Sequence, residues 1–129
     1  MMKRIVVLGS TGSIGRNTLK IADRYPGRFR VAGLAAGRNL GLLVRQARAF
    51  RPRAVSVERE ADALRARRLL AGLRIEVLAG AAGAEALASL PGADIVVSAM
   101  TGVQGLRPTL AAVRAGKIVA LANKESMVV

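Results

Sequence analysis

The sequence predicts an α/β fold: a single three-layer domain with a doubly wound, mostly parallel sheet between helices. Two observations support this prediction. Short β-branched runs alternate with stretches of helical period along the 129 residues, which is the pattern of repeated strand–helix units. The first apolar run, Ile5 to Leu8, breaks at three glycines just before the first helical stretch. A strand, a glycine turn and a helix in that order are typical of a Rossmann-like dinucleotide-binding domain.

The glycine turn at residues 9–15 is the first candidate ligand site. Gly9 would turn the chain off the strand, Gly12 would let a pyrophosphate approach bare backbone, and Gly15 would let the helix pack closely on the strand. Backbone amides and hydroxyls at the start of the helix would then bind the anion. The candidate cofactor-binding residues are Thr11, Gly12, Ser13 and Ile14, with Ser10 as a further hydroxyl donor. The alternative is a tight turn that binds no ligand.

The second expected strand, residues 28–36, ends at Gly37, Arg38 and Asn39. In NAD-binding domains of this type an acidic residue stands about 20 residues beyond the glycine turn and binds the ribose hydroxyls. Here an arginine takes that place, and a guanidinium attracts a 2′-phosphate where a carboxylate would repel it. The sequence therefore favours NADP over NAD. The alternative is an ordinary solvated arginine in a turn.

The rest of the chain continues the alternation, and we expect the usual strand order 3-2-1-4-5-6. The later strands are expected at residues 54–57, 74–78, 94–100 and 117–122. Helices are expected at 40–50, at 58–71 and at 79–90, and the one at 58–71 is expected to cover an edge of the sheet. A first helix is expected after Gly15, and a last helix is expected to end at Gly116. The expected apolar faces comprise Ile14, Thr18, Ile21, Ala22 and Tyr25; Leu40, Leu43, Val44 and Ala47; Ala61, Leu64 and the stem of Arg68; and Leu106, Leu110 and Val113.

Two later loops follow strands, at the edge of the sheet where ligands bind in such folds. Ala99 and Gly102 are small enough for a cofactor to lie over their backbone, and a plain turn is the alternative. The sixth strand ends in Asn123, Lys124 and Glu125. Lys124 could bind a substrate anion, while its neighbours could bind the cofactor and its ribose. The alternative is a polar turn in which Glu125 opens a helix.

Composition narrows the class of protein. The chain is 52% hydrophobic, so a folded core is expected, and no long uncharged apolar stretch predicts a membrane span. It has no cysteine and no expected signal peptide, which favours a cytoplasmic location. The formal charge of +13 could indicate nucleic acid, but the basic residues are dispersed and aromatic residues are scarce, so no nucleic-acid partner is expected. With no histidine and no second carboxylate near Glu125, no metal site is predicted.

Several segments together resemble a known family. They are Gly-Ser-Thr-Gly-Ser-Ile-Gly at 9–15, Ala-Ala-Gly-Arg-Asn at 35–39, Leu-Ala-Asn-Lys-Glu-Ser at 121–126 and the stretch 107–117. In this order and spacing they resemble 1-deoxy-D-xylulose 5-phosphate reductoisomerase. The resemblance covers the whole chain and corresponds to that family's N-terminal NADPH-binding domain. We therefore expect residues 1–129 to be this domain alone, with the catalytic and C-terminal domains absent, and the apolar ending at 127–129 also indicates truncation.

The resemblance implies an enzyme that converts 1-deoxy-D-xylulose 5-phosphate into 2-C-methyl-D-erythritol 4-phosphate in isoprenoid precursor synthesis, using NADPH and Mg²⁺, Mn²⁺ or Co²⁺. It implies a homodimer at full length, metal ligands beyond residue 129, and a chain inactive by itself. By resemblance, NADPH would contact Thr11, Gly12, Ser13, Ile14, Gly37, Arg38, Asn39, Asn123 and Glu125, and the phosphorylated sugar would contact Lys124. The alternatives are another NADP-dependent reductase, of the semialdehyde or homoserine dehydrogenase type, and a basic nucleic-acid-binding module.

Overall fold

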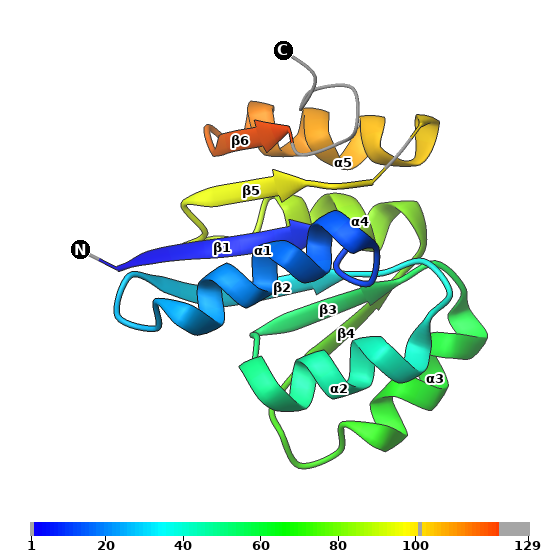
Figure 1. Cartoon of the computed structure of the whole chain (residues 1–129). Coiled ribbons are helices and arrows are strands. Elements are labelled where there is room, and N and C mark those ends of the chain that lie inside the picture. Colours follow the sequence, from blue (N-terminus) through cyan, green and yellow to red (C-terminus); the bar gives the residue numbers. More distant parts are fainter. Residues whose placement is uncertain (1, 101, 122–129) are drawn as a thin grey trace.

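The structure, a computed structural model, describes residues 2–100 and 102–121. Six parallel strands form one sheet in the order β4-β3-β2-β1-β5-β6 (Figure 1). The strands are β1 (Lys3–Leu8), β2 (Phe29–Ala35), β3 (Ala54–Val57), β4 (Glu76–Ala79), β5 (Ile95–Ser98) and β6 (Ile118–Leu121). The helices between them are α1 (Ser13–Arg24), α2 (Leu40–Phe50), α3 (Glu60–Leu69), α4 (Gly80–Ala88) and α5 (Val103–Arg114). The predicted α/β class is confirmed.

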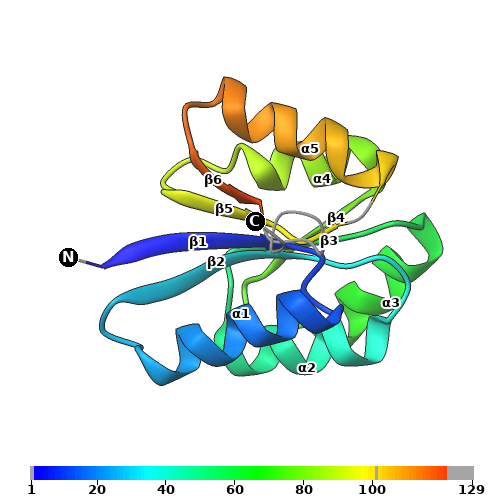
Figure 2. The same ribbon diagram turned by 45° about the horizontal axis from the view of Figure 1, so that its top comes forward.

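The helices lie on both faces of the sheet, which gives the three predicted layers. Figure 2 shows α1, α2 and α3 on one face, and α4 and α5 on the other. This follows from the topology, because crossovers between parallel strands are almost always right-handed. The chain moves outward from β1 to β4 along one face and then returns to pair β5 with β1. None of the described helices combines the length and the apolar character that crossing a membrane would require.

The core is divided by the sheet, and β1 contributes to both halves. Ile5 and Val7 pack with the cluster under α1, α2 and α3, whereas Val6 and Leu8 pack with the cluster under α4 and α5. Successive side chains of a strand point to opposite faces, so a strand covered on both sides is apolar at every position. The continuous apolar run that predicted this strand is therefore explained by its central place in the sheet.

The predicted strand order was wrong in one respect. In the usual order the fourth strand would lie beside the first, but here β4 pairs with β3 at the edge of the sheet and β5 pairs with β1. The chain therefore adds one more strand on the outward path before it crosses back through α4. The strand and helix patterns do not contain this information, because each outward βα unit looks like the next.

The predicted apolar faces of α1, α3 and α5 were also partly wrong, since small residues face the sheet in their place. In α5, Gly105, Pro108 and Ala112 are buried, while the leucines and valine expected inward are exposed. Small side chains let a helix approach the sheet closely, and the larger ones then project outward. In α1, the small residues Gly15 and Ala22 are buried beside Leu19, while Ile21 is exposed, as is Tyr25 just after the helix. In α3, Ala63 and Ala66 are buried beside Asp62, while Ala61 and Leu64 are exposed.

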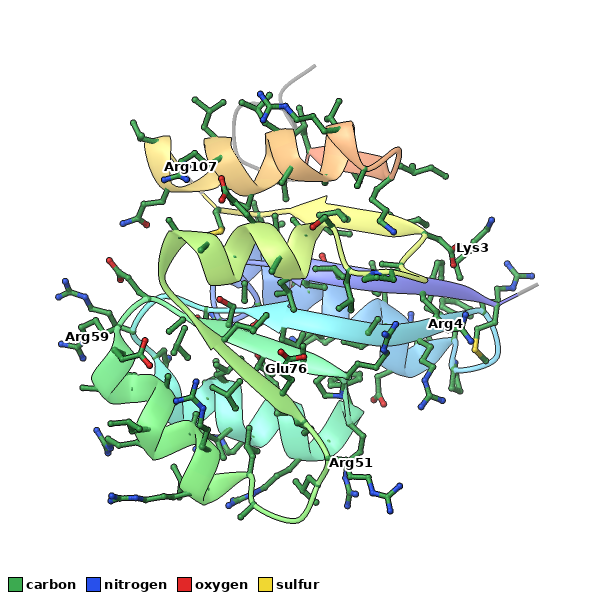
Figure 3. All side chains as sticks on the ribbon, turned by 180° about the vertical axis from the view of Figure 1, so that it is seen from behind. Lys3, Arg4, Arg51, Arg59, Glu76 and Arg107 are labelled. Atoms are coloured by element: carbon green, nitrogen blue, oxygen red, sulfur yellow. The ribbon has the colours of Figure 1, made fainter. Side chains whose placement is uncertain are left out.

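Polar contacts between side chains join the elements on the outside of the molecule. Arg107 of α5 pairs with Glu85 of α4, with 3.0 Å between Nε and Oε1 (Figure 3). In Figure 3 the two ends of the parallel strands lie on opposite sides of the molecule: Lys3 and Arg4 lie at one end, and Arg59, which follows β3, lies at the other. The second of these ends is the carboxyl edge, where the candidate site is built.

Candidate functional site

The candidate site lies at the carboxyl edge of the sheet, where the strand order reverses. β1 has β2 on one side and β5 on the other, and the chain leaves β1 and β5 toward opposite faces. In open α/β sheets this divergence creates a crevice outside the strand ends, and ligands bind there. The glycine turn after β1 forms one wall of the crevice, and the loop after β5 lies next to it.

Two of the three glycines in the turn are required by packing. Gly9 has a φ of +86°, and a Cβ there would lie 3.0 Å from the backbone carbonyl of Ala99. A Cβ on Gly15 would lie 2.1 Å from the carbonyl oxygen of Gly9, closer than any real contact. Gly12 differs, because a Cβ there would meet only the Gly9 oxygen, at 3.7 Å. The backbone at Gly12 is therefore open, as the pyrophosphate hypothesis requires.

The start of α1 presents backbone amides that donate to no other described residue. Gly12 is the N-cap, has no side chain to cap the helix, and donates its own amide to the Gly9 carbonyl at 3.3 Å. Within the described part of the chain, the amides of Thr11, Ser13 and Ile14 have no hydrogen-bond acceptor. Free amides at a helix N-terminus carry partial positive charge and bind anions. The geometry of the turn thus suits a phosphate group.

Ser10 does not have the role that the sequence suggested. Its side chain is fully buried and its Oγ has no hydrogen-bond partner among the described residues. Its amide donates to the carbonyl of Ala35 at 2.9 Å, as does the amide of Gly9 at 2.8 Å. Ser10 therefore fixes the turn to the end of β2 and does not offer a hydroxyl to the crevice, whereas the exposed Ser13 remains at its mouth.

Arg38 lies at the end of β2 with a side chain that is 71% exposed. Its Nε is 3.5 Å from Oε2 of Glu58, the residue that follows β3. An exposed pair of this kind contributes little to stability, about 0–1 kcal/mol, so the guanidinium remains available to an incoming anion. The sequence has an arginine and no acidic residue at this position, as the NADP hypothesis requires. Parallel pairing of β3 with β2 nevertheless brings an acidic residue from another segment, Glu58, beside it.

Asn39 has a structural task in addition to its predicted one. Its Oδ1 accepts a hydrogen bond from the amide of Leu42 at 3.2 Å and so caps the N-terminus of α2. This is the usual role of an asparagine before a helix. The side-chain amide nitrogen of Asn39 has no partner among the residues that the structure describes, and it remains free to donate to a ligand.

A cavity of about 220 Å³ opens beside Gly37, between the ends of β2 and β3 and the helices α4 and α5. Its lining is mostly apolar, with few polar groups. The residues that sequence reasoning missed here include Ser56, Glu58, Gly80, Met100 and Gln104. They come from four different segments, so no local motif could have indicated that they share one cavity.

The second predicted site, formed by Asn123, Lys124 and Glu125, lies outside the described residues. The last described strand, β6, pairs with β5 so that Leu121 lies opposite Ser98. Gly102, predicted as a possible cofactor platform, has a φ of +67° and forms the N-cap of α5. Across residues 2–100 and 102–121, no three acidic, histidine or cysteine side chains gather into a group that could hold a metal ion.

A parallel sheet whose order reverses beside a glycine turn, with free amides at the start of the following helix, defines a dinucleotide-binding α/β domain. A family model described as 1-deoxy-D-xylulose 5-phosphate reductoisomerase matches residues 5–129. The chain therefore belongs to the 1-deoxy-D-xylulose 5-phosphate reductoisomerase family. The family named from the sequence motifs is thus confirmed.

Individual relatives agree with this assignment. The chain is 58% identical over 127 residues to the reductoisomerase of Anaeromyxobacter sp. (strain K), covering 98% of this chain and 32% of that protein. It is 52% identical over 128 residues to that of Pelotomaculum thermopropionicum, covering 98% and 33%. The chain thus spans about a third of the length of the curated relatives it matches.

Solved structures of the family have the same fold. The reductoisomerase from Zymomonas mobilis in complex with NADPH superposes with a TM-score of 0.89 at 39% identity, covering 98% of this chain and 33% of that one. A reductoisomerase in complex with NADPH, fosmidomycin and magnesium superposes with a TM-score of 0.90 at 36% identity, covering 98% and 31%. These likenesses favour the reductoisomerase over the other reductases and the nucleic-acid module considered from the sequence.

Proposed function

We propose that this chain is the NADPH-binding part of a 1-deoxy-D-xylulose 5-phosphate reductoisomerase. The observation that carries the proposal is the set of amides at Thr11, Ser13 and Ile14, which find no acceptor within residues 2–100 and 102–121, beside the open backbone of Gly12. Two relatives in the same family were solved with NADPH bound. NADPH is a diphosphate with an additional 2′-phosphate, so its charges match a helix N-terminus and a separate cation.

The two ends of the site would bind different parts of the cofactor. The amides at the start of α1 would donate to the pyrophosphate, and the guanidinium of Arg38 would pair with the 2′-phosphate. Gly37 and Asn39 flank Arg38 in the chain, and Gly37 also lines the cavity. A mostly apolar cavity with few polar groups is the usual surrounding of a bound aromatic ring. The adenine would therefore occupy the space beside Gly37, next to the phosphate contact.

The residues beyond β6 would complete the site at the nicotinamide end. Asn123 and Glu125 would bind the cofactor, and Lys124 would bind the phosphorylated sugar. The described residues offer no set of ligands for a divalent metal. In our proposal the metal, Mg²⁺, Mn²⁺ or Co²⁺, belongs to other parts of a longer protein. That protein would be a cytoplasmic homodimer acting in isoprenoid precursor synthesis.

The chemistry assigned to this chain is therefore binding and orientation. NADPH supplies a hydride when bound, and the crevice would fix the dinucleotide along the carboxyl edge so that the hydride faces the sugar. The 129-residue chain should bind the cofactor without consuming it. A chain extended to the length of its relatives should consume NADPH when given 1-deoxy-D-xylulose 5-phosphate and a divalent metal.

Calorimetric titration of the 129-residue chain tests the proposal. NADPH should bind with a dissociation constant on the order of micromolar, and NADH should bind at least about tenfold more weakly because one charge-assisted contact is missing. Gly12→Ala is the matched variant: its Cβ fits the fold but occupies the open backbone, so the protein should stay folded and lose NADPH affinity. Equal affinity for the two cofactors, or an unaltered Gly12→Ala variant, would contradict the proposal.

A further inference from the structure

One buried polar side chain reaches the glycine turn from a distant part of the chain. Gln46, on α2, is only 7% exposed. Its Nε2 donates to the carbonyl oxygen of Ser10 at 2.9 Å, across 36 residues of sequence. Among the described residues it is the only side chain from outside the first strand–helix unit that hydrogen-bonds to the turn. No motif in the sequence singles it out.

The hydrogen bond fixes the orientation of a peptide group that belongs to the site. The described part of the chain has no cis peptide bond, so the bond between Ser10 and Thr11 is trans. In a planar trans peptide the carbonyl and the following amide point in opposite directions. Because the Ser10 carbonyl points to Gln46, the Thr11 amide points away from α2, and it has no acceptor among the described residues.

The same bond makes that amide a better donor. A carbonyl that accepts a hydrogen bond polarises its peptide group and strengthens the N–H on the other side. On the opposite flank the Ser10 amide is held by the carbonyl of Ala35 at 2.9 Å. The turn is thus fixed from two sides, by β2 through backbone and by α2 through Gln46.

Stability alone does not explain the glutamine. Its Oε1 is buried and has no hydrogen-bond partner among the described residues, and a buried acceptor without a partner is destabilising. A methionine at this place would fill a similar volume without that cost. The feature that a methionine could not supply is the donor to Ser10.

We propose that Gln46 is a positioning residue of the cofactor site: by holding the Ser10 carbonyl against α2, it aims the Thr11 amide at the cofactor pyrophosphate. The inference rests on the proposed function, since it needs a dinucleotide in the crevice. It also makes α2 a link between the two ends of the site. The helix is capped by Asn39, next to the cation Arg38, and contacts the turn through Gln46 two turns later.

The test uses two ligands that differ in what they contact. NADPH carries both the 2′-phosphate and the pyrophosphate, whereas adenosine 2′-monophosphate carries only the former and does not reach the glycine turn. In Gln46→Met the affinity for NADPH should fall about tenfold, while the affinity for adenosine 2′-monophosphate should stay within about twofold. The matched control is Leu43→Met, a volume-conserving change on the buried face of the same helix, which should leave both affinities unaltered.

Each result of this test either supports or overturns the proposed role of Gln46. Unchanged NADPH affinity in Gln46→Met, or equal losses for both ligands, would overturn the inference, since equal losses indicate a displaced helix. If the wild-type chain bound neither ligand, the proposed function itself would fail, which is a different result from a selective loss. Gln46→Asn provides a second variant should Gln46→Met not fold: it keeps the amide but is too short to reach Ser10, and the same selective loss is expected.

Discussion

Gly15→Ala should destabilise the protein more than any other single methyl addition in the glycine turn. The new Cβ would lie 2.1 Å from the Gly9 oxygen and 2.7 Å from the Cα of Ser10, well inside the 3.4 Å at which ordinary contact begins. Both neighbours are backbone atoms, so α1 and the turn must move apart. Overpacking a rigid site costs about 1–3 kcal/mol and occasionally more. Because neither side can rotate away, we expect about 3 kcal/mol or more.

Thermal unfolding followed by circular dichroism measures this cost. For a domain of this size 3 kcal/mol corresponds to a fall of about 10–15 °C in Tm. Gly41→Ala is the control, because Gly41 also lies in the first turn of a helix but a Cβ there meets nothing within 4 Å. This control should be neutral or stabilise by up to about 1 kcal/mol. Equal Tm values for the two variants would refute the packing argument.

Three further predictions concern the cofactor contacts, the opposite edge of the sheet and the core. Arg38→Ala should lower NADPH affinity about 10–100-fold, the worth of a charge-assisted contact, and leave NADH affinity nearly unaltered; parallel calorimetric titrations check this, and equal losses would remove Arg38 from the site. Asp94→Ala removes the acceptor of the Arg4 amide, 2.8 Å away at the amino edge, so urea denaturation should show a loss of about 1–2 kcal/mol with unaltered NADPH affinity. Leu87→Ala truncates a fully buried side chain of α4 and should cost about 2–5 kcal/mol by the same denaturation; a smaller loss would mean that α4 repacks.

Local features of the sequence predicted the fold class and the turn. The glycine at position 9 adopts a positive φ, and the glycine at 15 lies against backbone, so both residues carry constraints that any other residue would violate. The positive charge of Arg38, which follows β2, depends on the identity of a single residue, so it could be predicted directly from the sequence. Such features are predictable because their physical cause lies within a few residues.

Features that depend on pairing between distant segments could not be predicted. Glu58 approaches Arg38 only because β3 pairs with β2, and Gln46 reaches Ser10 only because α2 lies over the turn. The faces of α1, α3 and α5 were misjudged for a related reason. A helical pattern gives the period of the apolar residues, but the closeness of the sheet decides whether a leucine or an alanine faces it.

The central claim is that the amides at the start of α1 bind the phosphates of the cofactor. Titration of the ¹⁵N-labelled chain with NADPH, followed by amide resonances, tests it most directly. The account predicts large saturable shifts for Thr11, Ser13 and Ile14, with little change at the amino edge around Asp94. Shifts confined to other surfaces, or none at these three amides at saturating NADPH, would contradict it.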